Sequence, residues 1–210
     1  MTILQKPLKG KDNKFRCPWQ RNIEDYLLYH DEEWGLPVID DNKLFESICL
    51  EIFQSGLSWL IILRKRNALR ETFYEFNIEK IASFTEKDVT RILNTPEVIH
   101  NRQKITSIIN NARCALKIKE EFGSFSCYLW KFEPLHNFDK NSKNQSTPSE
   151  NPIIKSSTQL VASLKKKGFT FIGITIIDSF MQASGLLNGH LKGCTMYEKI
   201  EDIRNAMIRP

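Results

Sequence analysis

The sequence lacks any hydrophobic run that could cross a membrane, because no segment approaches the roughly 18 consecutive apolar residues of a span. Its N-terminus also lacks the apolar core and cleavage site of a secretory signal. No internal repeat divides the chain. These absences predict a soluble, cytoplasmic protein with no membrane partner.

The chain also lacks the paired cysteines of a secreted disulfide framework. It has five cysteines, and an odd number without a secretion signal indicates reduced thiols or metal ligands. The net charge of +5 favours an anionic partner only weakly, since many proteins that bind no nucleic acid carry the same excess. With 210 residues and 41% apolar content, the chain can bury a real core in one large domain or two small ones.

The stretch from Cys49 to Arg64 departs from an ordinary core pattern. A helix is predicted from Asp41 onward, because apolar residues recur at helical spacing behind an Asp40/Asp41 cap, namely Leu44, Phe45, Ile48, Cys49 and Ile52. Glu51 falls at the border of this buried face, where an unpaired charge is costly. It therefore needs either a ligand or a Lys or Arg partner.

A turn follows that helix. Gly56 breaks the helix and Ser58 can cap the next one, which leaves Leu57 on the turn and Trp59 directly after it. A buried acid, an exposed leucine and a tryptophan this close together could form a recognition site. A plain helical hairpin with an ion-paired Glu51 explains the same stretch equally well.

Four large aromatic residues lie within sixteen positions near the start, namely Trp19, Tyr26, Tyr29 and Trp34. Such clusters are most often core. Tyrosine and tryptophan also build stacking surfaces, because each offers a flat ring with a polar group.

Helices follow one another closely further along. Asn77 is expected to cap a helix over 78–84, and residues 85–88 resemble a capping box for the next helix. Another helix is expected from Asn101, so that residues 96–101 form a tight hairpin. Such a turn can present backbone N–H groups to a phosphate, with Arg102 and Lys104 adding charge. Many helical turns bind nothing, so the pattern alone is weak.

The second half contains a long polar segment. Residues 134–152 are rich in Asn, Ser and Pro and predict a surface loop. A helix is expected to start at a Ser156/Ser157 cap and end at Gly168, and a last apolar helix is expected over 175–184.

Two Cys/His pairs have suggestive spacing, Cys17 with His30 and His190 with Cys194. The second pair could reach one ion from a single helical turn, and two Cys with two His form a standard tetrahedral zinc set. A closed four-ligand shell leaves no place for activated water, so such a metal would be structural and would join the two ends of the chain. From the spacing alone, buried free thiols and surface histidines are the simpler explanation.

Taken together, eight separated motifs resemble the bacterial 3-methyladenine DNA glycosylase I family. They are FRCPW (15–19), YLLYHDEEWGLP (26–37), LFESICLE (44–51), QSGLSW (54–59), IHNRQKI (99–105), GFTFIG (168–173), SFMQA (179–183) and HLKGC (190–194). Their number and order make the resemblance specific.

The resemblance implies an all-α fold of the helix-hairpin-helix glycosylase superfamily, with the hairpin at about 96–101 and a structural zinc joining the N- and C-terminal segments. The glycosylase domain would span 15–197 and include a long loop at about 134–155. A flexible extension (1–14) and a C-terminal tail (198–210) would flank it.

The resemblance also assigns roles to residues. Glu51 would be the catalytic residue, and the base would be held by Tyr29 and Trp59 with Tyr26, Trp19 and Trp34 around them. DNA would be contacted by Gly56, Leu57, Arg102 and Lys104. Zinc would be held by Cys17, His30, His190 and Cys194.

The implied function is hydrolysis of the N-glycosidic bond of 3-methyladenine, a cationic purine flipped out of double-stranded DNA, by a monomeric enzyme. The alternative is a zinc-stapled helical module that binds damaged DNA without cutting it. No Asp occurs between Asp88 and Asp139, where other glycosylases of the superfamily place one, which favours a substrate that is already labile.

Four positions depart from the family pattern. Ile52 and Ile174 stand where the family commonly has small residues, and Gly189 stands where Asp is common before the zinc histidine. Glu97 replaces the usual hairpin glycine. A carboxylate there would repel a phosphate, so we expect weaker DNA anchoring by this hairpin.

Overall fold

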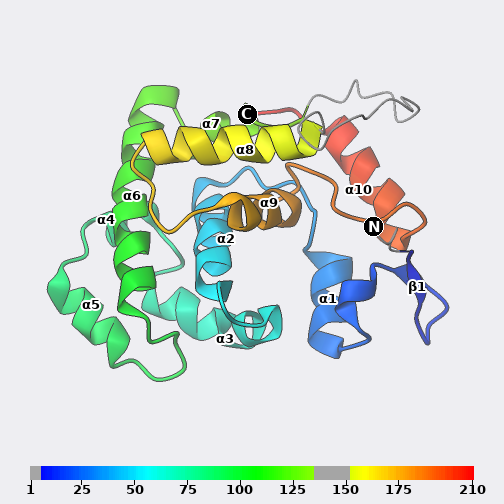
Figure 1. The fold of residues 1–210 in the computed structure, drawn as a ribbon, viewed down its shortest axis with the longest axis horizontal. Helices are drawn as coiled ribbons and strands as arrows, with labels where there is room; N and C mark the ends of the chain where they lie inside the picture. The colour runs from blue at the N-terminus through cyan, green and yellow to red at the C-terminus, as the bar shows by residue number, and fades with distance from the viewer. Residues whose placement is uncertain (1–5, 135–151) are drawn as a thin grey trace.

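The computed structural model describes residues 6–134 and 152–210, and the secondary structure of these residues is almost all helical (Figure 1). These are η1 (Pro18–Gln20), α1 (Glu24–Glu32), α2 (Asp41–Gln54), α3 (Trp59–Thr72), α4 (Ile78–Ala82), α5 (Glu86–Leu93), α6 (Arg102–Phe122), α7 (Phe125–Trp130), α8 (Pro152–Lys166), α9 (Ile174–Ala183) and α10 (Thr195–Ala206). The prediction of a helical fold is confirmed. No helix of the described residues is long and apolar enough to span a bilayer.

The helix starts follow the capping residues of the sequence. The Asp40 side chain accepts a hydrogen bond from the Lys43 amide at the start of α2, and Asn77 and Asn101 do the same for α4 and α6. Thr85 and Asp88 form the capping box of α5. These four predictions are confirmed.

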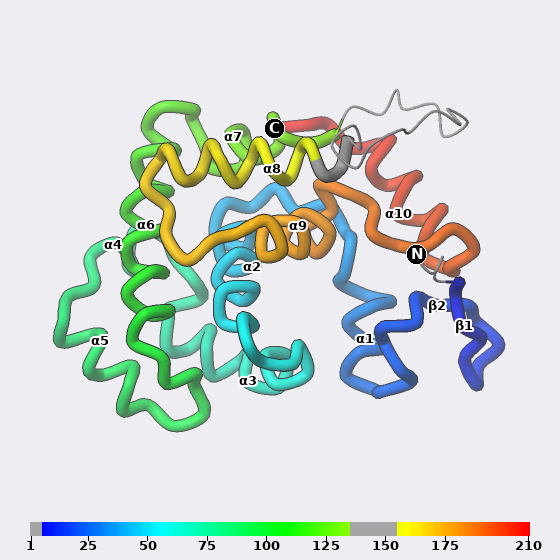
Figure 2. The backbone as a smooth tube through the Cα atoms, in the orientation of Figure 1, coloured from blue at the N-terminus to red at the C-terminus, as the bar shows by residue number. Residues whose placement is uncertain are grey.

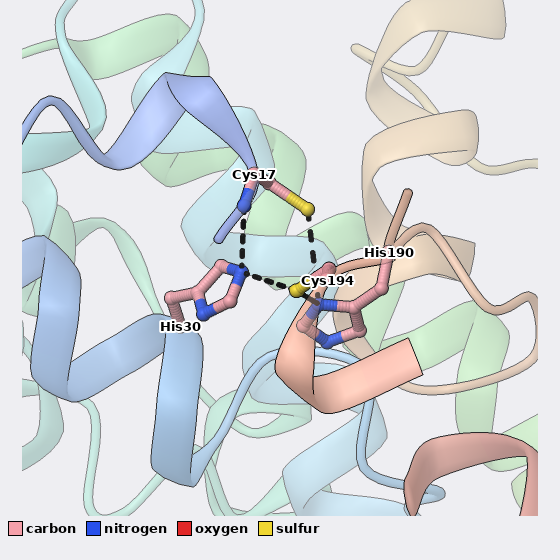
Figure 3. A group of neighbouring side chains, drawn as sticks. All are labelled: Cys17, His30, His190 and Cys194. Carbon is pink, nitrogen blue, oxygen red and sulfur yellow. Dashed lines mark hydrogen bonds between the residues drawn. The ribbon is translucent and has the colours of Figure 1, made fainter. Parts of the chain in front are cut away.

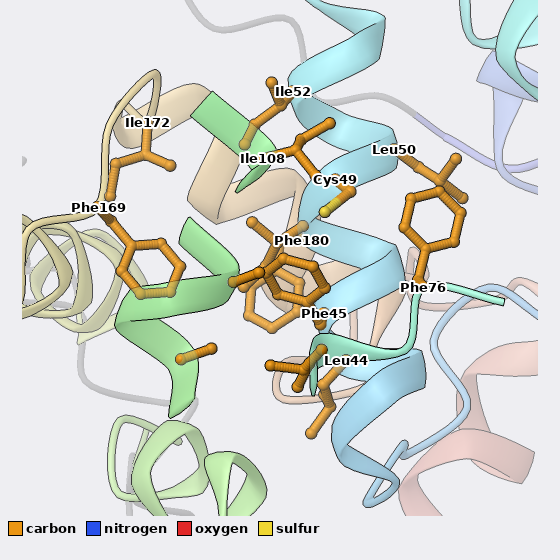
Figure 4. Packing of buried hydrophobic residues seen from close by; sticks show 14 of the residues in the cluster. Leu44, Phe45, Cys49, Leu50, Ile52, Phe76, Ile108, Phe169, Ile172 and Phe180 are labelled. Atoms are coloured by element: carbon orange, nitrogen blue, oxygen red, sulfur yellow. The ribbon is translucent and has the colours of Figure 1, made fainter. Parts of the chain in front are cut away.

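Helix α2 lies at the centre of the core. Its apolar face is completely buried (Figure 4), and its fully buried residues include Leu44, Phe45, Ile48, Cys49 and Ile52. The helix packs against α9, α3, α6 and α7. Any side chain on the border of this face therefore reaches the interior of the protein, and Glu51 is such a residue.

The N-terminal segment lies beside the start of α10 (Figure 2). Strand β1 (Leu8–Lys9) lies within the range expected to be a loose extension (1–14), and it pairs antiparallel with β2 (Phe15–Arg16), which follows that range. The β2 strand contacts α10, where the Thr195 hydroxyl donates to the Phe15 carbonyl over 3.0 Å. Helix α10 occupies most of the expected C-terminal tail.

One predicted helix start is wrong. Helix α8 begins at Pro152, so Ser156 and Ser157 lie inside it instead of capping it. Proline suits a first helical position, because its missing N–H would have no helical partner there. Most of the predicted loop at 134–155, namely residues 135–151, lies outside the described residues.

Candidate active site and metal centre

Four potential metal ligands from both ends of the chain meet in one buried cluster (Figure 3). The ligand atoms of Cys17, His30, His190 and Cys194 all lie within 4.8 Å of one another. Cys17 directly precedes η1, His30 lies near the end of α1, and Cys194 is the N-cap of α10. His190 lies in the loop before α10, so the two C-terminal ligands do not share a helical turn.

Hydrogen bonds around this cluster orient both imidazoles. His30 Nδ1 lies 2.8 Å from an Asp31 carboxylate oxygen, and His190 Nε2 lies 3.0 Å from the Trp34 carbonyl. These oxygens only accept, so the two nitrogens carry the protons. The lone pairs of His30 Nε2 and His190 Nδ1 therefore face Cys194 Sγ, each at 3.5 Å.

The donor set fits a tetrahedral zinc ion. Two sulfurs and two imidazole nitrogens converge, and each histidine is held by an acceptor on its far side, as zinc histidines usually are. A hydrogen bond with Cys17 is the largest cause that lowers the pKa of the Cys194 thiol. A thiolate is the form that binds metal.

A pocket of about 410 Å³ lies next to this cluster. All six residues expected to bind and process a base line it, namely Trp19, Tyr26, Tyr29, Trp34, Glu51 and Trp59. They come from η1, α1, α2 and α3, and Trp34 comes from the segment after α1. The aromatic cluster thus faces a cavity and does more than fill the core.

Glu51 is buried in this pocket without a partner. Its exposed fraction is 5%, and no hydrogen bond or ion pair from any described residue reaches its carboxylate. Burial raises the pKa of Glu51 to about 8. The hairpin with an ion-paired Glu51, the alternative that the sequence left open, is therefore not what the structure contains.

Tyr29 and Trp59 form one corner of the pocket. Their ring centroids are 5.3 Å apart and their planes are tilted by 50°, so the rings contact each other and a guest would stack on one face while its edge met the other. The indole N–H groups of Trp19 and Trp59 are buried and have no acceptor among the described residues. The pocket therefore offers apolar faces, free donors and one acid.

Trp34 joins the metal cluster to the pocket. Its carbonyl accepts from His190, and its ring lies 4.5 Å from the His190 ring and 5.0 Å from the Trp19 ring, measured between centroids. Displacing the cluster would therefore displace the pocket wall.

Five further lining residues were not predicted, namely Arg21, Gln54, Ser58, Ser179 and Gln182. Ser179 and Gln182 belong to α9 and lie three positions apart on a mostly apolar helix, which is the signal that could have revealed them. The Gln182 amide donates to Asp178 over 2.8 Å, which fixes its orientation.

The turn between α2 and α3 lies at the mouth of the pocket. Gly56 has a φ of 81°, which suits glycine, and the side chain of Leu57 is 38% exposed. A second cavity of about 460 Å³ adjoins this turn and shares Glu51, Gln54 and Ser179 with the first. Leu57 therefore lies beside a cavity that borders the first pocket.

The two cations expected to contact DNA lie in different surroundings. Arg102 is exposed and pairs with Glu86. Lys104 is only 4% exposed, and its ammonium donates to the carbonyls of Phe53 (2.8 Å) and Ser55 (2.5 Å) at the end of α2. Its charge is thus directed into the protein.

The α5–α6 turn contains one backbone departure. Glu97 has a φ of 65°, in the left-handed region that favours glycine, and its carboxylate is exposed 3.5 Å from Lys65 Nζ. The backbone at this position therefore has a conformation suited to glycine, although the residue is glutamate.

Comparisons with known proteins find similar sequences along most of the chain. A family model described as methyladenine glycosylase matches residues 19–197. DNA-3-methyladenine glycosylase 1 of Escherichia coli (strain K12) is 42% identical over 183 residues, covering 87% of this chain and 96% of that protein. DNA-3-methyladenine glycosylase of Haemophilus influenzae (strain ATCC 51907 / DSM 11121 / KW20 / Rd) is 40% identical over 182 residues, covering 85% and 96%.

Solved structures of related proteins have a similar fold. A crystal structure of 3-methyladenine DNA glycosylase I superposes with a TM-score of 0.73 at 41% identity and covers 87% of this chain and 99% of that one. A variant of 3-methyladenine DNA glycosylase I in complex with 3-methyladenine gives a TM-score of 0.74 at 36% identity, with coverage of 87% and 97%.

Proposed function

The chain belongs to the methyladenine glycosylase family, and from this premise we propose that it is a DNA repair enzyme that hydrolyses the N-glycosidic bond of 3-methyladenine in alkylated DNA. The observation that carries the proposal is the buried, unpartnered carboxyl group of Glu51 in a pocket of aromatic rings. Such a group suits a cationic, planar ligand, because the ligand supplies both the missing charge and the missing hydrogen bonds.

The pocket discriminates by charge. Adenine methylated at N3 is cationic, so it gains from the faces of Trp59 and Tyr29, at roughly 0.5 to 2 kcal/mol each, and from the Glu51 carboxylate. Neutral adenine gains less from either. The enzyme must first turn the nucleotide out of the duplex, which costs stacking energy, and Leu57 can offset part of that cost by filling the gap.

Glu51 changes its charge as the ligand arrives. With a pKa of about 8, the carboxyl group is mostly protonated at neutral pH in the free protein. A cation beside it favours the ionised form, so its proton leaves to solvent and the carboxylate accepts hydrogen bonds from the purine edge. Selection of a cation is thus coupled to release of a proton.

Bond cleavage then needs little further help. The methylated base departs as a neutral molecule, so it needs no protonation, and water adds to the sugar carbon that it leaves. Glu51 is the acid of the pocket, and it stabilises the positive charge before and during departure. The sequence contains no Asp from 89 to 138 that could serve as an additional base.

The cluster of Cys17, His30, His190 and Cys194 would hold one zinc ion. When bound, zinc would act structurally, since four protein ligands close its shell. His190 also contacts Trp34 of the pocket wall, so the zinc ligands would also fix the position of Trp34.

We further propose that a monomer binds double-stranded DNA across the pocket mouth, with α5, its turn and α6 acting as the helix-hairpin-helix. Arg102 is exposed for a phosphate contact. Lys104 instead holds the end of α2, and with it the Gly56–Leu57 turn, through the Phe53 and Ser55 carbonyls.

The direct test incubates the protein with alkylated duplex DNA and identifies the released free purines one by one. We expect 3-methyladenine to be released, and Glu51→Gln to lose about 100- to 1,000-fold in rate, as for loss of one preorganised electrostatic contact. Glu46→Gln is the matched control, because Glu46 lies on the same helix and is nearly as buried but pairs with Arg70. A protein that binds damaged DNA yet releases no base would instead be the non-catalytic module.

A further inference from the structure

The N-terminal hairpin lies before residues 19–197, which the family model matches, yet it is tied to the metal cluster. Its second strand holds Arg16, which is 5% exposed, and the turn that leads into this strand holds Asp12. A guanidinium this buried must have its donors satisfied. The hairpin is therefore more than a loose tail along its described residues.

Arg16 is held between two carboxylates. Its Nη1 and Nη2 donate to the two oxygens of Asp12 over 2.8 and 2.7 Å. Its Nε and Nη2 donate to Asp31 over 2.9 and 2.6 Å. Two-pronged pairs of this kind fix the plane of both partners. Asp12 therefore fixes the guanidinium that in turn fixes Asp31.

Asp31 in turn orients the metal ligand His30. Its carboxylate accepts from His30 Nδ1 over 2.8 Å, which leaves the Nε2 lone pair facing Cys194 Sγ. The hydrogen-bonded chain thus runs from Asp12 through Arg16 and Asp31 to His30. Carboxylates behind zinc histidines set ring orientation and metal affinity.

The hairpin also contacts the C-terminal half of the cluster. The Thr195 hydroxyl donates to the Phe15 carbonyl over 3.0 Å, directly after the ligand Cys194. Pro7 lies beside Gly193, and a Cβ added to that glycine would be 3.8 Å from Pro7 Cγ. The hairpin therefore bridges both pairs of ligands.

We propose that this hairpin, residues 6–16, is a clasp that holds the zinc site closed, and that Asp12 is its positioning residue. A substitution at Gly10 offers a second, independent way to disturb the clasp. A Cβ at Gly10 would lie 2.8 Å from Asp12 Oδ1 and 3.0 Å from Arg16 Nη1, so any side chain there pushes the pair apart. The proposal rests on the zinc site proposed above but not on base excision, so the two can fail separately.

The test measures zinc transfer from the full-length, zinc-loaded protein to a colorimetric chelator. We expect Asp31→Asn to speed release by about 10- to 100-fold, the usual effect of losing a partner behind a ligand. Asp12→Ala and Gly10→Ala, one link further away, should each speed release by about 3- to 10-fold. Glu121→Gln is the control, because it removes a surface ion pair (with Lys167) that has no link to the cluster.

A second measurement distinguishes a change in the position of the metal ligands from a general loss of stability. In the cobalt-loaded protein, Asp12→Ala should change the visible bands of the tetrahedral ion, while Glu121→Gln should not. Asp12→Asn keeps the side-chain shape and serves if Asp12→Ala folds poorly. Wild-type release rates in Asp12→Ala and Gly10→Ala, or a purified chain without zinc, would overturn the proposal. Loss of base excision with these zinc results intact would overturn only the enzymatic function.

Discussion

Two buried polar sites among the described residues, the Cys/His cluster and the pocket of Glu51, differ in whether their polar atoms have partners. In the Cys/His cluster, each histidine has one nitrogen bonded to an acceptor, Asp31 or the Trp34 carbonyl, and the other facing a sulfur. In the adjoining pocket, Glu51 has no partner among the described residues. The histidine nitrogens of the first site are therefore all in contact with protein atoms, whereas the carboxyl group of the second site is available to a ligand.

This difference matters energetically. An unpartnered polar group costs free energy when buried, so folding alone gives no reason to keep one. Glu51 and the indole N–H groups of Trp19 and Trp59 are three such groups lining one cavity. A cationic purine that fills the cavity would satisfy the acid, and its ring nitrogens would offer acceptors to the indoles.

Removing the metal should have the largest effect, because the ligand atoms of Cys17, His30, His190 and Cys194 would then lack their shared partner, as Glu51 does in the pocket. We expect about one zinc per chain, and we expect chelation to lower the melting temperature by about 10 °C or more, since binding to a preformed site contributes directly to folding free energy. Calorimetry with and without chelator measures this. A metal-free protein of undiminished stability would remove the zinc site from the account.

Replacing Trp59 should weaken the second site without disturbing the first. Loss of one stacking face costs roughly 0.5 to 2 kcal/mol, so Trp59→Leu should lower kcat/KM on alkylated DNA by about 2- to 30-fold. Trp59→Phe keeps a ring and should lose less. Equal activity in all three proteins would show that the base does not stack on this residue.

Lys104 sharpens the comparison, because it is a buried charge with two carbonyl partners. Lys104→Met should cost about 1 to 3 kcal/mol of stability, since the Phe53 and Ser55 carbonyls lose their donor. The salt dependence of DNA affinity should stay unchanged. Arg102→Met should leave stability nearly unchanged but lower the slope of log DNA affinity against log salt concentration by about one. A reduced slope in Lys104→Met would instead show a phosphate contact.

The sequence predicted the elements whose signals are local. Apolar spacing and capping residues located α2, α4, α5 and α6, because each signal lies within the helix concerned. The period of α2 also placed Glu51 at the border of the buried face. Whether that acid had an internal partner depended on the tertiary fold, so it could not be read from spacing.

Lys104 shows what local patterns miss. It lies off the apolar stripe of α6, and its charge suggested a surface position. The buried face of α6 is wider than that stripe and includes Ser107 and Asn111. Lys104 thereby reaches the carbonyls at the end of α2, which lack helical partners. Only the packing of two helices distant in sequence makes this contact.

Ser179 and Gln182 were missed for a related reason. They lie more than 120 residues beyond Glu51, so nothing in their own neighbourhood indicates a shared pocket. The metal ligands show the same limit, since the spacing of Cys17 and His30 fits no short zinc motif and the resemblance to a family was needed to group the four.

The most direct test of the central claim is the pH dependence of kcat/KM for 3-methyladenine release, in wild type and in Glu51→Gln. Burial raises the pKa of Glu51 to about 8, so the free protein carries the carboxylate only as the pH rises through that value. We predict that wild-type kcat/KM climbs about tenfold per pH unit and levels off above that pKa, while Glu51→Gln stays low and flat. A flat wild-type profile, or the same slope in both proteins, would contradict the role of this acid.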